Sequence, residues 1–124
     1  KKFPKDTWGK FLNAKGADYN AFTSSDYTGY YINAPSENLD LIMQVESDRM
    51  RNLTLDPKDV DSEREVVKEE RRMRYDDNVE GGIREKLSNS MFVSLPYKWL
   101  PIGSMVDLNA ASMADLHSFY KTFL

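Results

Sequence analysis

The chain has 124 residues with no cysteine and a single histidine. Without cysteine there is no disulfide framework and no thiolate ligand for a metal, and cysteine usage does not indicate the compartment. No apolar run approaches the roughly 20 residues of a membrane span, and the net charge of -3 leaves no basic surface for nucleic acid or anionic membranes. We therefore expect no nucleic-acid partner and no membrane span. The bacterial periplasm, the cytoplasm and an organelle matrix are all compatible locations.

The length suits one soluble domain or a piece of a larger one. The start, Lys1-Lys2-Phe3-Pro4, is too abrupt for a signal peptide. We therefore expect residues 1–124 to be a single partial domain that belongs to a longer chain.

Capping residues and apolar periodicity predict five helices. They are a helix from the Asp6 cap to a left-handed stop at Gly16, one from Ser36 to about Asn52, one from Asp56-Pro57 to about Tyr75, one through Ile83, Leu87 and Met91, and one that starts at Ser112 with Asp115. Residues Pro96 to Gly103 are expected to form a loop. In the helix after Pro35, the predicted buried side, which should pack on a hairpin, comprises Leu39, Ile42, Met43, Met50 and Leu53.

Residues 19–34 are β-branched, aromatic and small, and Ser24-Ser25-Asp26 interrupts them. This pattern predicts two antiparallel strands joined by a tight turn. Because two strands alone are marginal in water, we expect the hairpin to belong to a larger sheet. The predicted class is α+β, with this hairpin packed against about five helices.

Glu63 and Glu70 lie seven residues apart in the middle of the third predicted helix. At about 100° per residue, seven positions return to within roughly 20° of the starting direction, so both carboxylates share one face. Val60 and Val67 lie on the same face, which predicts a stripe of alternating apolar and acidic residues that enters the core. Buried acids need a partner, commonly a cation or a metal.

A helix so dense in charge is also typical of a solvated face crossed by salt bridges. The residues that fit this alternative well are Glu65, Lys68, Glu69, Arg71 and Arg72. It does not explain why Glu63 and Glu70 fall on the valine side.

The order of several short motifs resembles the insulinase-like, or pitrilysin, family of zinc peptidases, family M16. The motifs are Asn20-Ala21-Phe22-Thr23, Asp26-Tyr27-Thr28, Glu37-Asn38-Leu39, Asp48-Arg49-Met50, the run from Glu63 to Arg72, Pro96-Tyr97, Ile102-Gly103 and the stretch from Asp115 to Tyr120. Each motif alone is weakly specific, but together, in the family's order, they cover nearly the whole chain.

The resemblance implies a zinc endopeptidase that hydrolyses peptides or small unfolded proteins. In the family, an H-x-x-E-H helix supplies two histidine ligands and the general base, and a later helix supplies a third ligand. Aligned on the Glu-Arg-x-Val-Val run, Glu70 falls at the third-ligand position, and Glu63 matches the accompanying acid that supports the site. The H-x-x-E-H motif is absent from these residues, and in the family it lies just before the position of Lys1. We therefore expect the chain alone to be inactive.

The resemblance also implies that the first strand is an edge to which an extended peptide adds as a further strand. Carried over by position, the residues that would contact this substrate are Asn20, Ala21, Phe22 and Thr23. The alternative is an ordinary strand start with Phe22 in the core. The lone histidine, His117, is interpreted as a packing or surface residue and not as a replacement ligand.

Three classes of function are open at this point. The first is a segment of an active zinc peptidase, completed by the rest of an M16 chain or by a homologous M16 half. The second is a non-catalytic M16-like structural or peptide-binding subunit, although retention of both acids favours the first. The third is an unrelated helical interaction module, which leaves the motifs between Asn20 and Tyr31 unexplained.

Overall fold

The computed structural model describes residues 7–123, and the chain divides into two compact units with the boundary after Thr54. The described residues contain six α-helices and one two-stranded antiparallel sheet, which confirms the α+β class. The predicted cap at Asp6 lies outside the described residues. That both units belong to one partial domain stays a prediction.

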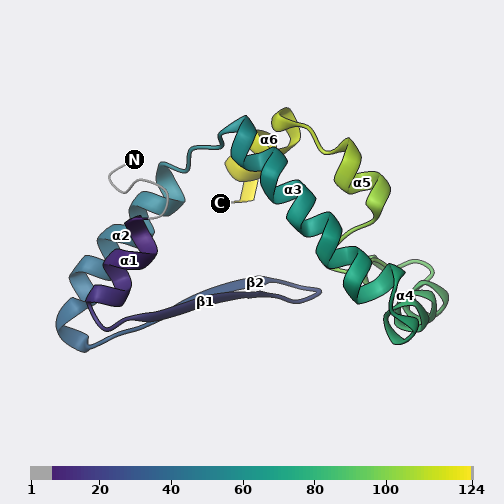
Figure 1. The fold of residues 1–124 in the computed structure, drawn as a ribbon, viewed down its shortest axis with the longest axis horizontal. Helices are drawn as coiled ribbons and strands as arrows, with labels where there is room; N and C mark the ends of the chain where they lie inside the picture. The colour runs from purple at the N-terminus through teal and green to yellow at the C-terminus, as the bar shows by residue number, and fades with distance from the viewer. Residues whose placement is uncertain (1–6, 124) are drawn as a thin grey trace. The chain divides into compact units, whose positions relative to one another are not determined.

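The first unit begins with α1 (Thr7–Ala14), which ends as expected at Gly16, a residue with the left-handed φ of +69°. The hairpin of β1 (Asp18–Thr23) and β2 (Thr28–Asn33) follows as a long two-stranded ribbon (Figure 1). At its turn, the hydroxyl of Ser24 donates to the carbonyl of Tyr27 (3.0 Å). Both strands are therefore where the sequence predicts them.

The helix after Pro35 differs from the prediction. A 3₁₀ turn (Ser36–Asn38) precedes α2 (Leu39–Arg51), and Ser36 does not act as the predicted cap, because Pro35 is the N-cap of the turn and Asn38 is the N-cap of α2. Of the α2 side chains, Val45 is buried and Ile42 is partly buried. The expectation of a buried side is wrong for Leu39, Met43, Met50 and Leu53, which are 40% to 62% exposed.

The second unit begins with α3 (Pro57–Arg71), whose start has the predicted chemistry. The carboxylate of Asp56 accepts a hydrogen bond from the backbone N–H of Lys58 (2.8 Å), and Pro57 occupies the first turn, where its missing N–H costs nothing. The helix then widens into one π-helical turn (Arg72–Asp76). Asn78 caps the next helix, α4 (Val79–Met91), by accepting from the backbone N–H of Gly81 (2.9 Å). The predicted end of the helix near Tyr75 is thus confirmed.

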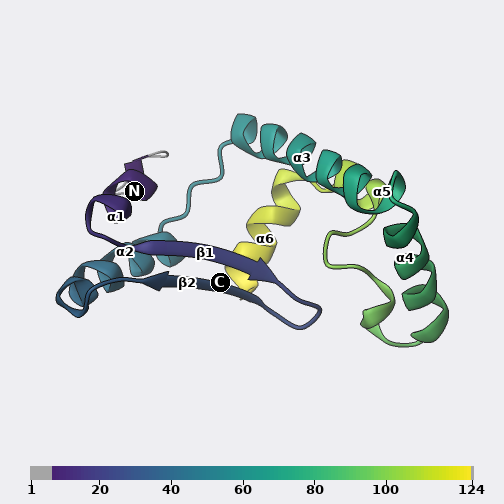
Figure 2. The ribbon, with the colours of Figure 1, turned by 60° about the horizontal axis from the view of Figure 1, so that its bottom comes forward.

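The segment from Pro96 to Gly103 is mostly irregular, with a 3₁₀ turn at Pro96–Lys98. A short helix that the sequence analysis did not predict, α5 (Met105–Ala110), follows and is capped by the hydroxyl of Ser104. It lies beside α3 (Figure 2). The last helix, α6 (Met113–Phe123), starts at the predicted capping box, in which Ser112 and Asp115 exchange side-chain to backbone hydrogen bonds. None of the helices described over residues 7–123 is long and apolar enough to cross a membrane.

Candidate functional site

The covered side of α3 is cationic. The side chains of Arg64, Lys68 and Arg71 are 18%, 14% and 8% exposed, and their spacing of four and three residues places them on one face of the helix. Arg71 had been expected on a solvated face and is instead buried. The segment that contains α5 packs against this cationic side.

Glu63 and Glu70 form a second row on α3, next to the cationic side. Glu63 is exposed, so the expectation that both acids enter the core is wrong for Glu63. Glu70 is partly exposed (side chain 41%), and its carboxylate makes an ion pair with Arg74 (3.0 Å). Val60 and Val67 on the same row are only partly buried. The described residues that pack on α3 cover the arginine side, which leaves the acidic side accessible.

Ion pairs at helical spacing lie along the rest of α3, as the salt-bridge alternative predicts. Lys68 pairs with Glu65 (2.8 Å) and Arg72 with Glu69 (2.9 Å). The hydrogen bond from Lys68 lowers the pKa of the Glu65 carboxyl. Ion pairs of exposed carboxylates such as these contribute little to stability, because water and salt screen them. The salt-bridge interpretation therefore holds for these residues, and Glu70 itself makes such a pair with Arg74, whereas the expected entry of Glu63 into the core is not observed.

The donor chemistry of the acidic row fits zinc in part. A carboxylate oxygen is a normal zinc ligand, and the Glu70 carboxylate is accessible and held by an exposed ion pair rather than by a buried partner. Among residues 7–123, no three His, Cys, Asp or Glu side chains lie close enough together to hold a metal ion. His117 is exposed on α6 and belongs to no such group. Within the described residues, Glu70 can supply one ligand of a set.

The end of α3 that carries Glu70 is held by contacts to distant parts of the second unit. The guanidinium of Arg71 donates to both carboxylate oxygens of Glu85 (2.9 and 3.1 Å) and to the carbonyl of Gly103 (2.8 Å), and it lies 3.4 Å from Asp76. It also lies 5.9 Å from the ring centroid of Tyr75, within cation–π range. These contacts fix the helix end immediately after the proposed ligand.

Gly81 allows α4 to approach the π-helical turn closely. A Cβ atom at Gly81 would lie 1.9 Å from the carbonyl oxygen of Arg74, whereas one at Gly82 would meet the oxygen of Tyr75 at 3.4 Å. No side chain fits at the first position. The absence of a Cβ at Gly81 therefore sets the position of the turn that carries Arg74, the partner of Glu70.

In the first unit, β1 pairs only with β2 among the described strands, so its other edge has no strand beside it. The four residues of β1 expected to bind substrate are all exposed. The side-chain oxygen of Asn20 accepts a hydrogen bond from the backbone N–H of Ala21 (2.8 Å), and Thr23 bonds Thr28 across the pair. The strand thus has an open edge and polar backbone groups within reach of solvent.

Phe22 does not lie in a core, since its side chain is 48% exposed. Its ring packs edge-on against Tyr27 (5.5 Å between centroids) and over Gly29, its cross-strand partner.

On β2, the guanidinium of Arg49 from α2 lies 4.3 Å from the Tyr30 ring centroid. The side chain of Arg49 also donates hydrogen bonds to the carboxylate of Glu46, which raises the pKa of Arg49.

Two features of the α3 site were missed in the sequence. The burial of Arg64 and Arg71 follows the same seven-residue spacing as the acids, one position later, and the repeated Glu-Arg pair is the signal that could have indicated it. The close approach at Gly81 had no comparable signal, because Gly81-Gly82 looked only like a weak helix start.

A comparison with protein families finds that the model of the family described as insulinase (peptidase family M16) matches residues 1–98. The zinc protease PqqE of Helicobacter pylori is 34% identical over 114 residues, which cover 92% of this chain and 26% of that protein. The human mitochondrial cytochrome b-c1 complex subunit 1 is 25% identical over 122 residues, 98% of this chain and 25% of that protein.

The fold also matches a solved structure, the crystal structure of a protease from Helicobacter pylori. The TM-score is 0.94 at 32% sequence identity, and the match covers 99% of this chain and 30% of that one. The chain thus spans about a quarter of the length of these curated relatives.

Proposed function

The chain belongs to the insulinase family of peptidases, family M16, and on this premise we propose that it forms part of a zinc-dependent endopeptidase. In this proposal, the chain contributes the third zinc ligand, Glu70, and the edge strand that binds the substrate. The observation that carries the proposal is the accessible acidic row of α3, in which Glu63 and Glu70 share one face.

Glu70 would bind zinc through its carboxylate, and Arg74 would hold that carboxylate in place through their ion pair. Zinc, when bound, polarises a peptide carbonyl and lowers the pKa of water, which are the requirements of peptide hydrolysis at neutral pH. Glu63, seven residues earlier on the same face of α3, would orient groups around the site without binding the metal. The histidine ligands and the general base would come from an H-x-x-E-H helix outside these residues.

The substrate would be an extended peptide that adds to the free edge of β1 through main-chain hydrogen bonds. A carbonyl of the peptide would take the place of the Asn20 side-chain oxygen on the backbone N–H of Ala21. The exposed ring of Phe22 would contact a side chain of the peptide. Recognition through the backbone explains tolerance of many substrate sequences, since every peptide has the same main-chain groups.

The division of roles between the two acids is testable in the full-length protein. We expect Glu70→Gln to remove most of the bound zinc, because an amide is a weaker ligand than a carboxylate. Glu63→Gln should retain more zinc but lower peptidase activity by about 10- to 100-fold, as for groups that orient a metal ligand. Zinc content by atomic absorption and cleavage of a fluorogenic peptide measure both effects. Equal loss of metal in the two variants would contradict the assignment.

The isolated 124-residue chain should bind zinc weakly and show no peptidase activity, because it supplies one ligand of three. Stoichiometric, tight zinc binding by the isolated chain in a chelator competition would contradict this.

Phe22→Ala in the full-length protein provides a separate test of the edge strand. It should raise KM for peptides and leave zinc content unchanged, and an unchanged KM would argue against β1 as the substrate strand.

A non-catalytic subunit is the second candidate. The likeness to the cytochrome b-c1 complex subunit favours it, because the name of that relative describes a subunit and not a protease. The zinc measurement separates the two candidates. If the full-length protein binds no zinc, the result supports the non-catalytic subunit; if it binds zinc and Glu70→Gln removes that zinc, the result supports the peptidase.

A further inference from the structure

The acids of α3 are each followed by an arginine, in the pairs Glu63-Arg64 and Glu70-Arg71. Because consecutive helical residues are about 100° apart, the two arginines form their own row beside the acidic row, with the same seven-residue spacing. Both arginine side chains are largely covered, whereas the acids are accessible. The two rows therefore face different surroundings along the same two turns of helix.

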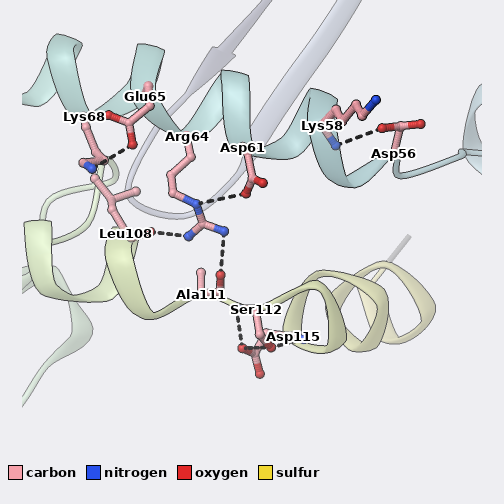
Figure 3. A network of polar contacts seen from close by, with 10 residues as sticks. All are labelled: Asp56, Lys58, Asp61, Arg64, Glu65, Lys68, Leu108, Ala111, Ser112 and Asp115. Atoms are coloured by element: carbon pink, nitrogen blue, oxygen red, sulfur yellow. Dashed lines mark hydrogen bonds and ion pairs between the residues drawn. The ribbon is translucent and has the colours of Figure 1, made fainter.

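Arg64 binds the carbonyl end of α5 (Figure 3). One terminal nitrogen donates to the carbonyl of Leu108, in the last turn of α5, and the other donates to the carbonyl of Ala111, its C-cap (2.7 Å). The last carbonyls of a helix have no partner within it and carry partial negative charge, so a guanidinium is well suited to this position. Asp61, 3.9 Å from Nε, lies on the far side of the same guanidinium.

Arg71 binds the opposite end of the same segment. Its Nη1 donates to the carbonyl of Gly103, which directly precedes Ser104, the N-cap of α5. Its Nη2 binds Glu85, so α4 is tied to the same side chain. The Nε atom is buried without a hydrogen-bond partner among the described residues, a cost that the other contacts outweigh.

The two arginines thus hold residues 103–111 at both ends against one side of α3. A single contact would let the segment pivot on α3, whereas two contacts about two turns apart on one side of the helix also fix the angle between them. We propose that Arg64 and Arg71 are positioning residues for the acidic row. By clamping the 103–111 segment on the adjacent side of α3, they set the direction in which Glu63 and Glu70 point. This inference rests on the proposed zinc function of that row.

Substitution by lysine is the informative test. Lysine keeps the positive charge, but its single ammonium cannot bind two carbonyls, or a carbonyl and a carboxylate, in the planar geometry of a guanidinium. In the full-length protein, Arg64→Lys and Arg71→Lys should each weaken zinc binding by about tenfold, comparable to the loss of a group that orients a ligand. Arg72→Lys is the matched control, because Arg72 lies beside Arg71 but pairs only with exposed Glu69 among the contacts described. It should bind zinc like the wild type.

Zinc affinity by chelator competition is read together with kcat and KM at saturating zinc. A displaced acidic row should weaken zinc binding and lower kcat per zinc-loaded molecule, with KM for the peptide unchanged. General destabilisation would instead lower the fraction of folded protein, and would leave the zinc affinity and the kcat per zinc-loaded molecule as in the wild type. If Arg71→Lys does not fold, Glu85→Gln weakens the same contact while preserving side-chain size, and a smaller loss of zinc affinity is expected there.

Glu70→Gln is measured in the same titration, so that the two inferences fail separately. Loss of zinc binding in Glu70→Gln, with wild-type affinity in folded Arg64→Lys and Arg71→Lys, would overturn the clamp alone. Wild-type zinc binding in Glu70→Gln would overturn the zinc role of the row, and with it the role of the clamp.

Discussion

The two units of the chain stabilise their functional elements in different ways. In the first unit, the hairpin leaves Phe22, Tyr27 and Tyr30 exposed, and its side chains contact other exposed or partly exposed side chains, as Phe22 contacts Tyr27 and Tyr30 contacts Arg49. In the second unit, α3 buries cations against backbone carbonyls that are 32 to 47 residues away in the sequence. This difference suits the proposed roles, because a strand that accepts a peptide needs an open edge and a helix that supplies a metal ligand needs a fixed orientation.

The largest effect is expected where the long-range contacts of the second unit meet. Arg71→Met should lower the free energy of unfolding by about 2 to 4 kcal/mol, because it leaves Glu85 and the carbonyl of Gly103 without their charged donor. Arg72→Met, the matched control, should change it by less than about 1 kcal/mol, since its ion pair is exposed. Urea unfolding of the wild type and both variants measures these changes in the free energy of unfolding. Equal effects would remove the distinction between the two arginines.

A somewhat smaller effect is expected at the contact between α4 and the π-helical turn. Gly81→Ala should destabilise the protein by about 1 to 3 kcal/mol, because the added Cβ would overlap the backbone of Arg74. Gly82→Ala has room and improves helix propensity, so it should be neutral or stabilising by up to about 1 kcal/mol. In thermal unfolding, Gly81→Ala should lower the melting temperature and Gly82→Ala should leave it unchanged or raise it. A tolerated Gly81→Ala would show that α4 is free to shift.

In the first unit, the expected energies are smaller, because the contacts are exposed. A double-mutant cycle between Arg49→Met and Tyr30→Leu should give a coupling of about 0.5 to 1 kcal/mol from the cation–π contact. The same cycle with Tyr31→Leu should give a coupling near zero, because successive strand residues point to opposite faces. Chemical denaturation of the four proteins in each cycle is sufficient. A coupling to Tyr31 as large as that to Tyr30 would refute the geometry.

The smallest predicted effect is a local titration at the start of α6. The hydroxyl and the backbone N–H of Ser112 both donate to the carboxylate of Asp115 and lower its pKa. The resulting stabilisation is present above the unfolded pKa, about 3.9 for aspartate, and is lost as the pH falls through the lower folded pKa. NMR titration of the Asp115 carboxyl should show the shift, and Ser112→Ala should reduce it. An Asp115 that titrates at the ordinary value in the wild type would contradict the capping box.

Local signals in the sequence were sufficient for most of the fold. Three such signals have the predicted role, and each depends on residues only a few positions apart: Asp56-Pro57, Ser112 with Asp115, and the turn at Ser24. The orientation of α3 depends instead on carbonyls at Gly103, Leu108 and Ala111. A backbone carbonyl has no sequence signature, so residue types could not show which groups Arg64 and Arg71 bind. The short helix α5 did have a local signal that was missed, because Ser104 with Asp107 is the same capping pattern as Ser112 with Asp115.

In the candidate site too, relations that depend only on local spacing were predicted, and those that depend on distant contacts were not. Helical periodicity placed Glu63 and Glu70 on one face, because that relation depends only on their spacing. It could not determine which face of α3 is covered, and the acids had been expected inside while Glu63 is exposed. Which side of a charged helix is buried depends on the partners that reach it.

The zinc affinity of the full-length protein carrying Glu70→Gln, compared with Glu69→Gln, tests the central claim most directly. The two glutamates are neighbours on α3, each paired with an exposed arginine, but only Glu70 lies on the row of Glu63. We predict that Glu70→Gln weakens zinc binding by about 100-fold or more, while Glu69→Gln binds zinc like the wild type. Equal affinities in the two variants would contradict the assignment of Glu70 as a zinc ligand.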